Sequence, residues 1–168
     1  MRKAEGAVAD SQHLRRALGR FATGVTIVTC VGRDGQRVGL TANSFNALSL
    51  DPPLILWSLR LKSPSLRAFA DASHFAVNVL ARDQLALSRH FSRSGADKFA
   101  LGEWAAGTGG VPVLAGSVAH FECSLDAAQE AGDHMLFIGR VLHAQEHARA
   151  PLVFHGGHYR SLGEALEE

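Results

Sequence analysis

The stretch SVAHFECSLDAAQEAGDHMLFIGRVLHAQEH, residues 117–147, decides the fold. It holds two long strand-like segments, 117–131 and 134–147, on either side of Gly132-Asp133, a dipeptide typical of tight turns between strands. Strands joined by so short a turn pair antiparallel. The longest regular part of the chain is therefore predicted to be a β-hairpin.

Shorter strand-like segments precede and follow this hairpin. They are rich in β-branched and other apolar residues, and turn signals such as Asp34-Gly35 separate them. The residues 43–53 are predicted to form a loop, because Pro52-Pro53 forbids a helix there. The predicted strands are 25–31, 38–42, 54–59, 74–80 and, after residue 150, two short segments separated by Gly156-Gly157.

Three short helices are expected between the strands. One begins at Ser11, the second has Ser63 as its N-cap and Pro64 in its first turn, and the third is capped by Asp83. The first carries one apolar stripe at helical spacing: Leu14, Ala17, Leu18 and Phe21. Because strands follow one another through hairpin-like links, the pattern favours an antiparallel barrel with helices packed outside, not a wound βαβ sheet.

Composition limits the classes of protein that need to be considered. The 168 residues, 46% hydrophobic and 20% charged, fit a loose tail at 1–10 and a single soluble domain at 11–168. A net charge of +1 gives no electrostatic argument for nucleic acid or a membrane surface. No apolar run approaches the ~20 residues of a membrane span, and the N-terminus has no apolar signal core. Cys30 and Cys123 are predicted to be reduced core thiols of a cytoplasmic protein.

The first candidate site is Lys62-Ser63-Pro64-Ser65. A capped helix start offers free N–H groups and a partial positive charge, to which Lys62 adds a full charge and the serines add hydroxyl groups. These are the features of a phosphate site. The same residues also fit an ordinary helix cap beside a solvated lysine. On these residues alone that interpretation is favoured, because such caps are common.

The second candidate is GLTANSFNALS, residues 39–49. Its small residues would let a ligand approach the backbone, and Thr41, Asn43 and Ser44 could offer hydrogen bonds to a polar ring. A tight turn that bonds to itself through its Asn and Ser side chains explains the same residues equally well.

The third candidate is His134, which follows the Gly132-Asp133 turn and should project from the end of the hairpin. An imidazole there could hydrogen-bond a ligand or carry a proton near neutral pH, although a plain surface histidine fits as well. No metal site is predicted, because HExxH spacing is absent and His155 and His158 have no further ligand nearby. The sequence also lacks the GxGxxG of a Rossmann site and the GxSxG of a serine hydrolase.

Taken together, six segments in order resemble the short-chain flavin reductases, the reductase partners of two-component flavin monooxygenases. The resemblance covers the chain from about Leu14 to Leu162 and implies a flavin-binding split β-barrel. The segments are LGRFATGVTIVT (18–29), GLTANSFNALSLDPPL (39–54), FAVNVLARDQ (75–84), DKFA (97–100), GDHMLFIGRV (132–141) and PLVFHGGHYRSL (151–162).

The resemblance implies where each part of a bound flavin would lie. The ring and ribityl chain would contact Leu40, Thr41, Ala42, Asn43, Ser44, Asn46 and Ala47. The phosphate end would contact Ser58, Leu59, Lys62 and Ser63. Phe91, Lys98 and Phe99 would close over the outer half of the flavin, while His134, Tyr159 and Arg160 would border the nicotinamide side.

The resemblance also implies the reaction, which is hydride transfer from NADH or NADPH to FMN or FAD, with FMN and NADH preferred here. The flavin carries the chemistry and the protein aligns the two rings, so neither a covalent nucleophile nor a metal is expected. Reduced flavin would pass to a separate oxygenase, and family members are usually homodimers. Two alternatives stay open at this point: a related reductase with a corrinoid or ferric acceptor, and a flavin-binding protein without turnover.

Overall fold

The main sheet has seven strands and holds the predicted hairpin near its middle. The computed structural model describes residues 11–95 and 97–166, so the expected tail at 1–10 lies outside the described residues. Every neighbouring pair of strands in this sheet is antiparallel. In spatial order the strands are β3 (Arg37–Ala42), β2 (Thr26–Val31), β6 (His74–Val79), β9 (Ala119–Ala131), β10 (His134–Glu146), β5 (Pro53–Arg60) and β4 (Asn46–Leu50).

The hairpin β9–β10 is as the sequence predicts. Both strands have 13 residues, and His134 pairs with Ala131 across a turn in which Gly132 has a φ of +60°. The register shifts twice, between Ile138 and Gly139 and again between Val141 and His143. β10 also pairs with β5, so His134 lies opposite Arg60 at one end of the sheet.

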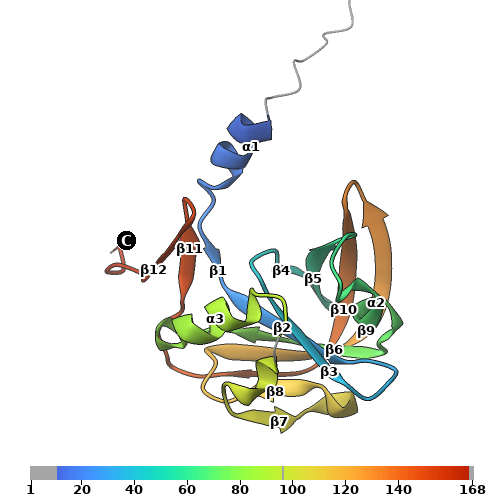
Figure 1. Cartoon of the computed structure of the whole chain (residues 1–168). Helices are drawn as coiled ribbons and strands as arrows, with labels where there is room; N and C mark the ends of the chain where they lie inside the picture. The colour runs from blue at the N-terminus through green and yellow to red at the C-terminus, as the bar shows by residue number, and fades with distance from the viewer. Residues whose placement is uncertain (1–10, 96, 167–168) are drawn as a thin grey trace, which may run out of the picture.

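Smaller elements surround this sheet (Figure 1). A three-stranded sheet joins β1 (Thr23–Gly24), β11 (Val153–His155) and β12 (His158–Arg160), and a separate hairpin joins β7 (Trp104–Ala106) and β8 (Pro112–Leu114). The helices are α1 (Ser11–Leu18), α2 (Leu66–Asp71) and α3 (Leu85–Phe91), with the 3₁₀ turns η1 (Arg82–Gln84), η2 (Lys98–Ala100) and η3 (Thr108–Gly110). The chain is mainly β, with few short helices, as predicted.

The core lies on both sides of β2. Val28 packs into a cluster around Trp57, whose ring stacks on Phe137 at 4.7 Å between centroids. Ile27 packs into a second cluster, which contains Phe91 of α3. Burial on both faces explains why β2 reads as an almost continuous apolar run instead of an alternating one.

The stretch predicted as a loop, 43–53, contains the strand β4, which corrects the sequence-based assignment. Proline excludes a helix but not an extended segment that turns sharply. Leu50 pairs with Pro53, so Asp51 and Pro52 form a two-residue turn into β5. The loop-rich region 92–113 likewise contains β7 and the start of β8, which the sequence pattern did not predict.

Two of the expected helix starts are also corrected. The helix α2 has Ser65 as its N-cap, two residues after the predicted cap; the hydroxyl of Ser63 instead accepts a hydrogen bond from the Ser65 N–H at 3.3 Å. The carboxylate of Asp83 accepts a hydrogen bond from Arg149 at 2.5 Å and does not cap the helix as predicted. The side chain that accepts a backbone N–H at this helix start is that of Gln84, from Ala81.

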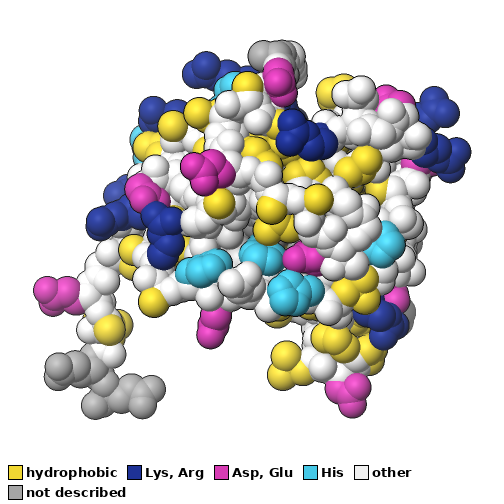
Figure 2. All heavy atoms as spheres, turned by 90° about the horizontal axis from the view of Figure 1, so that it is seen from below, with side chains coloured by type: hydrophobic (Ala, Val, Ile, Leu, Met, Phe, Trp, Pro, Cys, Tyr) yellow, Lys and Arg dark blue, Asp and Glu magenta, His cyan; other side chains and the backbone are white. Residues whose placement is uncertain are grey.

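The first helix is shorter than its apolar stripe suggests. It ends at Leu18, and the stripe is not covered: Leu14, Leu18 and Phe21 are 49%, 66% and 73% exposed. In Figure 1, α1 stands away from the main sheet. Among the described residues, no helix is long and apolar enough to cross a membrane. Acidic and basic side chains intermingle on the face shown in Figure 2, in keeping with the small net charge.

Candidate functional site

A groove of about 750 Å³ lies where four segments meet: the end of β3, the end of β5 with the loop after it, the loop after α3, and the start of β10. Its volume falls in the usual range of small-molecule sites. Most of the predicted site residues line it: Leu40, Thr41, Ala42, Asn43, Ser44, Ser58, Leu59, Lys62, Ser63, Phe91, Lys98 and His134.

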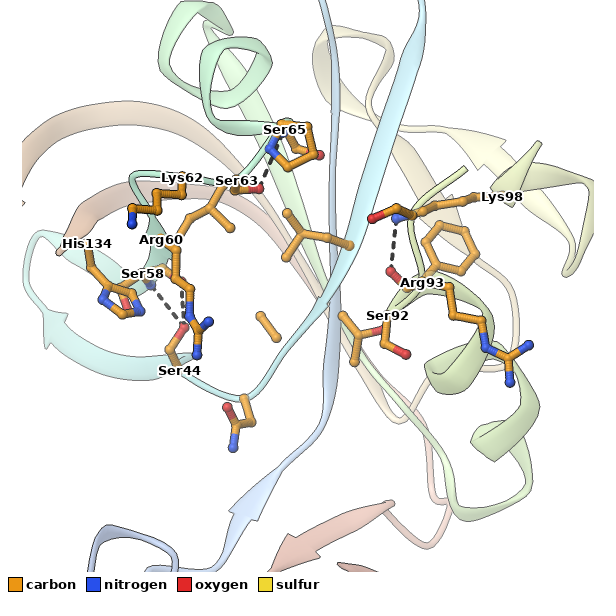
Figure 3. Close-up of a pocket in the computed structure, with 18 of the residues that line it drawn as sticks. Ser44, Ser58, Arg60, Lys62, Ser63, Ser65, Ser92, Arg93, Lys98 and His134 are labelled. Carbon is orange, nitrogen blue, oxygen red and sulfur yellow. Dashed lines mark hydrogen bonds between the residues drawn. The ribbon is translucent and has the colours of Figure 1, made fainter. Parts of the chain in front are cut away.

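The groove is strongly cationic. Arg60, Lys62, Arg93 and Lys98 all line it, and none of the described lining residues is acidic. Figure 3 shows Arg60, Lys62 and His134 on one wall and Arg93 on the other. A concave surface with several positive charges and no carboxylate favours an anionic ligand such as a phosphate ester.

Two of the hydroxyl groups predicted to face a ligand are used to build the wall. The Ser44 hydroxyl donates to the Ser58 carbonyl and accepts from the Ser58 N–H, both at 3.0 Å. The Thr41 hydroxyl donates to the Ser88 carbonyl of α3 at 2.7 Å. These two hydroxyls therefore bond to the protein, but their partners lie on α3 and β5 and not in a turn of the segment itself. The exposed Asn43 side chain borders the groove.

Lys98 fastens the far wall. Its ammonium donates to the carbonyls of Gly39 and Phe91, both at 3.0 Å, and burial lowers its pKa. Phe91 contacts Phe99 edge-on at 5.3 Å between centroids, and Phe99 lies in the core behind it, not in the groove. A Cβ on Gly39 would meet the Phe91 ring at 2.8 Å, so only glycine lets β3 approach this aromatic pair.

His134 is held by its neighbour in the turn. Its Nδ1 lies 2.7 Å from the Asp133 carboxylate, and this hydrogen bond holds the pKa of Asp133 below its usual range. Because an ionised carboxylate only accepts, Nδ1 carries the proton. A neutral His134 therefore offers Nε2 as an acceptor, and about a third of its side chain is exposed.

Other predicted residues lie outside the groove. Asn46 and Ala47 are exposed on β4, opposite Leu56 and Ile55. The Tyr159 hydroxyl bonds the Ser88 hydroxyl at 2.9 Å, and its ring borders a recess of about 160 Å³ on another side of Thr41, Ala42 and Asn43. Arg160 is exposed on β12 and lines neither cavity.

Comparison with known proteins identifies the family. The family model described as a flavin reductase like domain matches residues 18–163. The chain belongs to this family. It is similar to the FMN reductase (NADH) SmoA of Agrobacterium fabrum, with 47% identity over 88% of this chain and 84% of that protein. It is also 41% identical to the flavin-dependent monooxygenase reductase subunit HsaB of Rhodococcus jostii, over 94% and 83% of the two chains.

Solved structures of flavin reductases share the fold. The Streptomyces globisporus NADH:FAD oxidoreductase SgcE6, in complex with NAD and FAD fragments, superposes with a TM-score of 0.88. It is 38% identical, and the match covers 94% of this chain and 96% of that chain. The flavin reductase PheA2 superposes with a TM-score of 0.83 at 35% identity, over 92% and 99% of the two chains. The predicted split-barrel class is therefore confirmed.

Several groove residues of this family member were not predicted. Arg60 could have been found from the sequence, because residues two apart on a strand share a face and Ser58 was already expected to line the site. Arg93 and its neighbours carry no local signal, since the fold of α3 alone brings them to the groove. The unpredicted lining residues are Arg60, Ser92, Arg93, Ser94 and Gly95. Pro64 and Ser65 also line the groove, and they belong to the segment 62–65 that was predicted as a candidate phosphate site.

Proposed function

We propose that this protein is an NAD(P)H:flavin oxidoreductase that supplies reduced flavin to a partner oxygenase. The observation that carries the proposal is the cationic groove, whose described lining has no carboxylate and falls within residues 18–163, the part of the chain that the flavin reductase family model matches. The relatives named as an FMN reductase (NADH), as a monooxygenase reductase subunit and as an NADH:FAD oxidoreductase support the same activity.

The groove fits a phosphorylated flavin. Arg60 and Lys62 on one wall, with Arg93 on the other, would attract the phosphate, because their exposed side chains supply positive charge and no acidic residue is among the described lining residues. The segment 40–44 would hold the ring through its backbone and Asn43, with Phe91 at the far wall. When bound, the flavin supplies the acceptor for hydride, so the protein needs no nucleophile of its own.

The remaining task of the chain is to position the nicotinamide. Hydride transfer requires the donor carbon to be held at a near-attack distance from the acceptor. We propose that His134 assists by accepting a hydrogen bond at Nε2 from the carboxamide of the nicotinamide, since Asp133 fixes the proton on Nδ1. Tyr159, in the recess on another side of residues 41–43, would border this region, and Arg160 would reach it from β12.

We propose FMN and NADH as the preferred pair, a choice that the name of the 47% identical relative supports. We further propose a cytoplasmic homodimer. The apolar stripe of Leu14 and Leu18 on α1 and Phe21 just after it supports association, since it leaves a row of large apolar side chains uncovered in one chain. Sedimentation equilibrium should then give about twice the 17.9 kDa mass of the chain; a catalytically active monomer would contradict the dimer.

The activity is tested by following NADH absorbance with and without added flavin. We expect rapid NADH oxidation that depends on FMN or FAD, together with a change in flavin fluorescence during titration at micromolar protein. If neither flavin binds at tens of micromolar, the proposed function is wrong. Flavin binding without NADH oxidation would instead indicate a flavin-binding protein without turnover.

A further inference from the structure

Two histidines and a glutamate come together outside the groove. His120 and Glu122 lie two residues apart on β9, so their side chains share one face of the sheet. His143 on β10 pairs with Glu122. None of the three lines the groove, and His143 comes nine residues after His134 along β10, a span of about 30 Å.

A β-bulge brings His143 to this position. The register passes from the pair Val141–Cys123 directly to His143–Glu122, so Leu142 is an extra residue on β10. Without that bulge, Leu142 would lie opposite Glu122 and the histidine would move to the next pair. The irregularity therefore has a local consequence, which is to place a second imidazole beside the carboxylate.

The spacing of the three groups suits a small ion. One candidate ligand atom from each residue lies within 4.8 Å of the others, and His120 Nε2 is 3.5 Å from Glu122 Oε1. Two ligands at about 2.1 Å from a tetrahedral ion are about 3.4 Å apart. The His120–Glu122 pair already has this separation, and the exposed imidazole of His143 needs only a small movement to join it.

The carboxylate of Glu122 is arranged as that of a metal ligand. The N–H and the hydroxyl of Thr108 in η3 both donate to Oε2, at 2.6 and 2.5 Å, which leaves Oε1 toward His120. Gly107 permits this approach, since a Cβ there would lie 2.9 Å from the carboxylate. Ligating carboxylates commonly have such a second set of hydrogen bonds to hold them in place.

His120 is buried without a good partner of its own. It is 6% exposed, its Nδ1 has no hydrogen bond, and the 3.5 Å from Nε2 to Glu122 is long for one. A buried imidazole with unmet hydrogen-bonding capacity needs an explanation, and a bound cation provides one.

We propose that His120, Glu122 and His143 form a zinc site. Two imidazoles and one carboxylate are a known ligand set for Zn²⁺, with water at the fourth position. In Figure 2, histidine side chains gather near acidic ones toward the middle of the face shown. The ion would join the start of β9, the end of β10 and, through Thr108, the β7–β8 hairpin. The ion would lie apart from the flavin groove, since none of its three ligands lines that groove.

The test is metal binding by the full chain without a histidine tag. The chain is first stripped with a chelator. After it is reloaded with Zn²⁺ and dialysed, we expect one Zn²⁺ per chain by elemental analysis. The stripped chain should give a Co²⁺ spectrum typical of four-coordinate N/O ligation, and its Tm should rise with added Zn²⁺. His143→Ala should weaken Zn²⁺ binding at least tenfold in calorimetry and remove the rise in Tm, and its exposed position should leave folding intact.

The matched control is His13→Ala, which removes an exposed histidine on α1 and should bind Zn²⁺ like the parent. Glu122→Gln should also lose the ion. If that variant fails to fold, His143→Ala still decides the question. Absence of stoichiometric Zn²⁺ in the parent, or equal binding by the parent and His143→Ala, would overturn the proposal and leave a buried His–Glu pair without a metal.

Discussion

Replacing Lys62 by alanine isolates the phosphate end of the proposed flavin site. Lys62 lies on the wall of the groove with an exposed side chain, and within the described structure it makes no hydrogen bond or ion pair with the protein. Its removal should therefore leave the fold intact. Lys98 offers no such test, because its ammonium donates to two backbone carbonyls and its loss would loosen the wall.

The expected magnitude follows from exposure. A hydrogen bond to a charged group contributes about 1.5–3 kcal/mol, and solvent screening places an exposed lysine at the lower limit. About 1.4 kcal/mol corresponds to a factor of ten in affinity. Lys62→Ala should thus bind FMN about tenfold more weakly. Arg60 and Arg93, which line the same groove, hold the remaining affinity.

The assay compares FMN with riboflavin, which lacks the phosphate. Fluorescence titration should show the loss for FMN alone, and the difference between variant and parent should shrink as ionic strength rises. The control is Arg82→Ala, which removes an exposed positive charge outside the groove and should change neither affinity. Equal FMN affinity in Lys62→Ala and parent, or an equal loss for riboflavin, would refute this placement of the phosphate.

Three further outcomes are expected. His134→Ala should raise the KM for NADH and lower kcat about ten- to a hundredfold with little change in flavin affinity, and His134→Asn should recover part of the loss; steady-state kinetics would show this. Gly39→Ala should lower the free energy of unfolding in urea by about 1–3 kcal/mol, since its Cβ would overlap the Phe91 ring. Burial raises the pKa of Cys30 and Cys123 to about 12, so a thiol reagent at pH 8 should label both only after unfolding.

The strands that the sequence predicts are those whose own pattern is sufficient. β2 is rich in β-branched residues, and β9 and β10 are long segments on either side of a Gly-Asp turn; the fold keeps all three. β4 was missed because its mixed residues, NALSL, are mostly exposed and stand just before Pro52-Pro53, and only pairing with β5 makes them a strand. β7 has three residues, too few to show a period, and its pairing with β8 alone defines it.

The residues of the candidate site also fall into those that the sequence could place and those that it could not. Residues 40–44 and Lys62 could be placed from sequence because the chemistry is concentrated in short segments. Arg93 could not, since it reaches the groove only through the packing of α3 on β3. The group of His120, Glu122 and His143 shows the same limit of sequence more clearly. The alternation of a strand could show that His120 and Glu122 share a face, but only the bulged register of β10 brings His143 to them.

The polar segment before β5 has two tasks that the sequence alone does not separate. Thr41 and Ser44 tie it to α3 and β5 through backbone carbonyls, and this fixes the wall to which a ligand ring would dock. The charges that would recognise a phosphate come from other segments: Arg60 at the end of β5, Lys62 after it, and Arg93 after α3. The wall of the groove and its positive charges thus come from different segments of the chain. Changes to Thr41 or Ser44 should therefore weaken riboflavin and FMN alike, whereas changes to the cations should separate the two flavins.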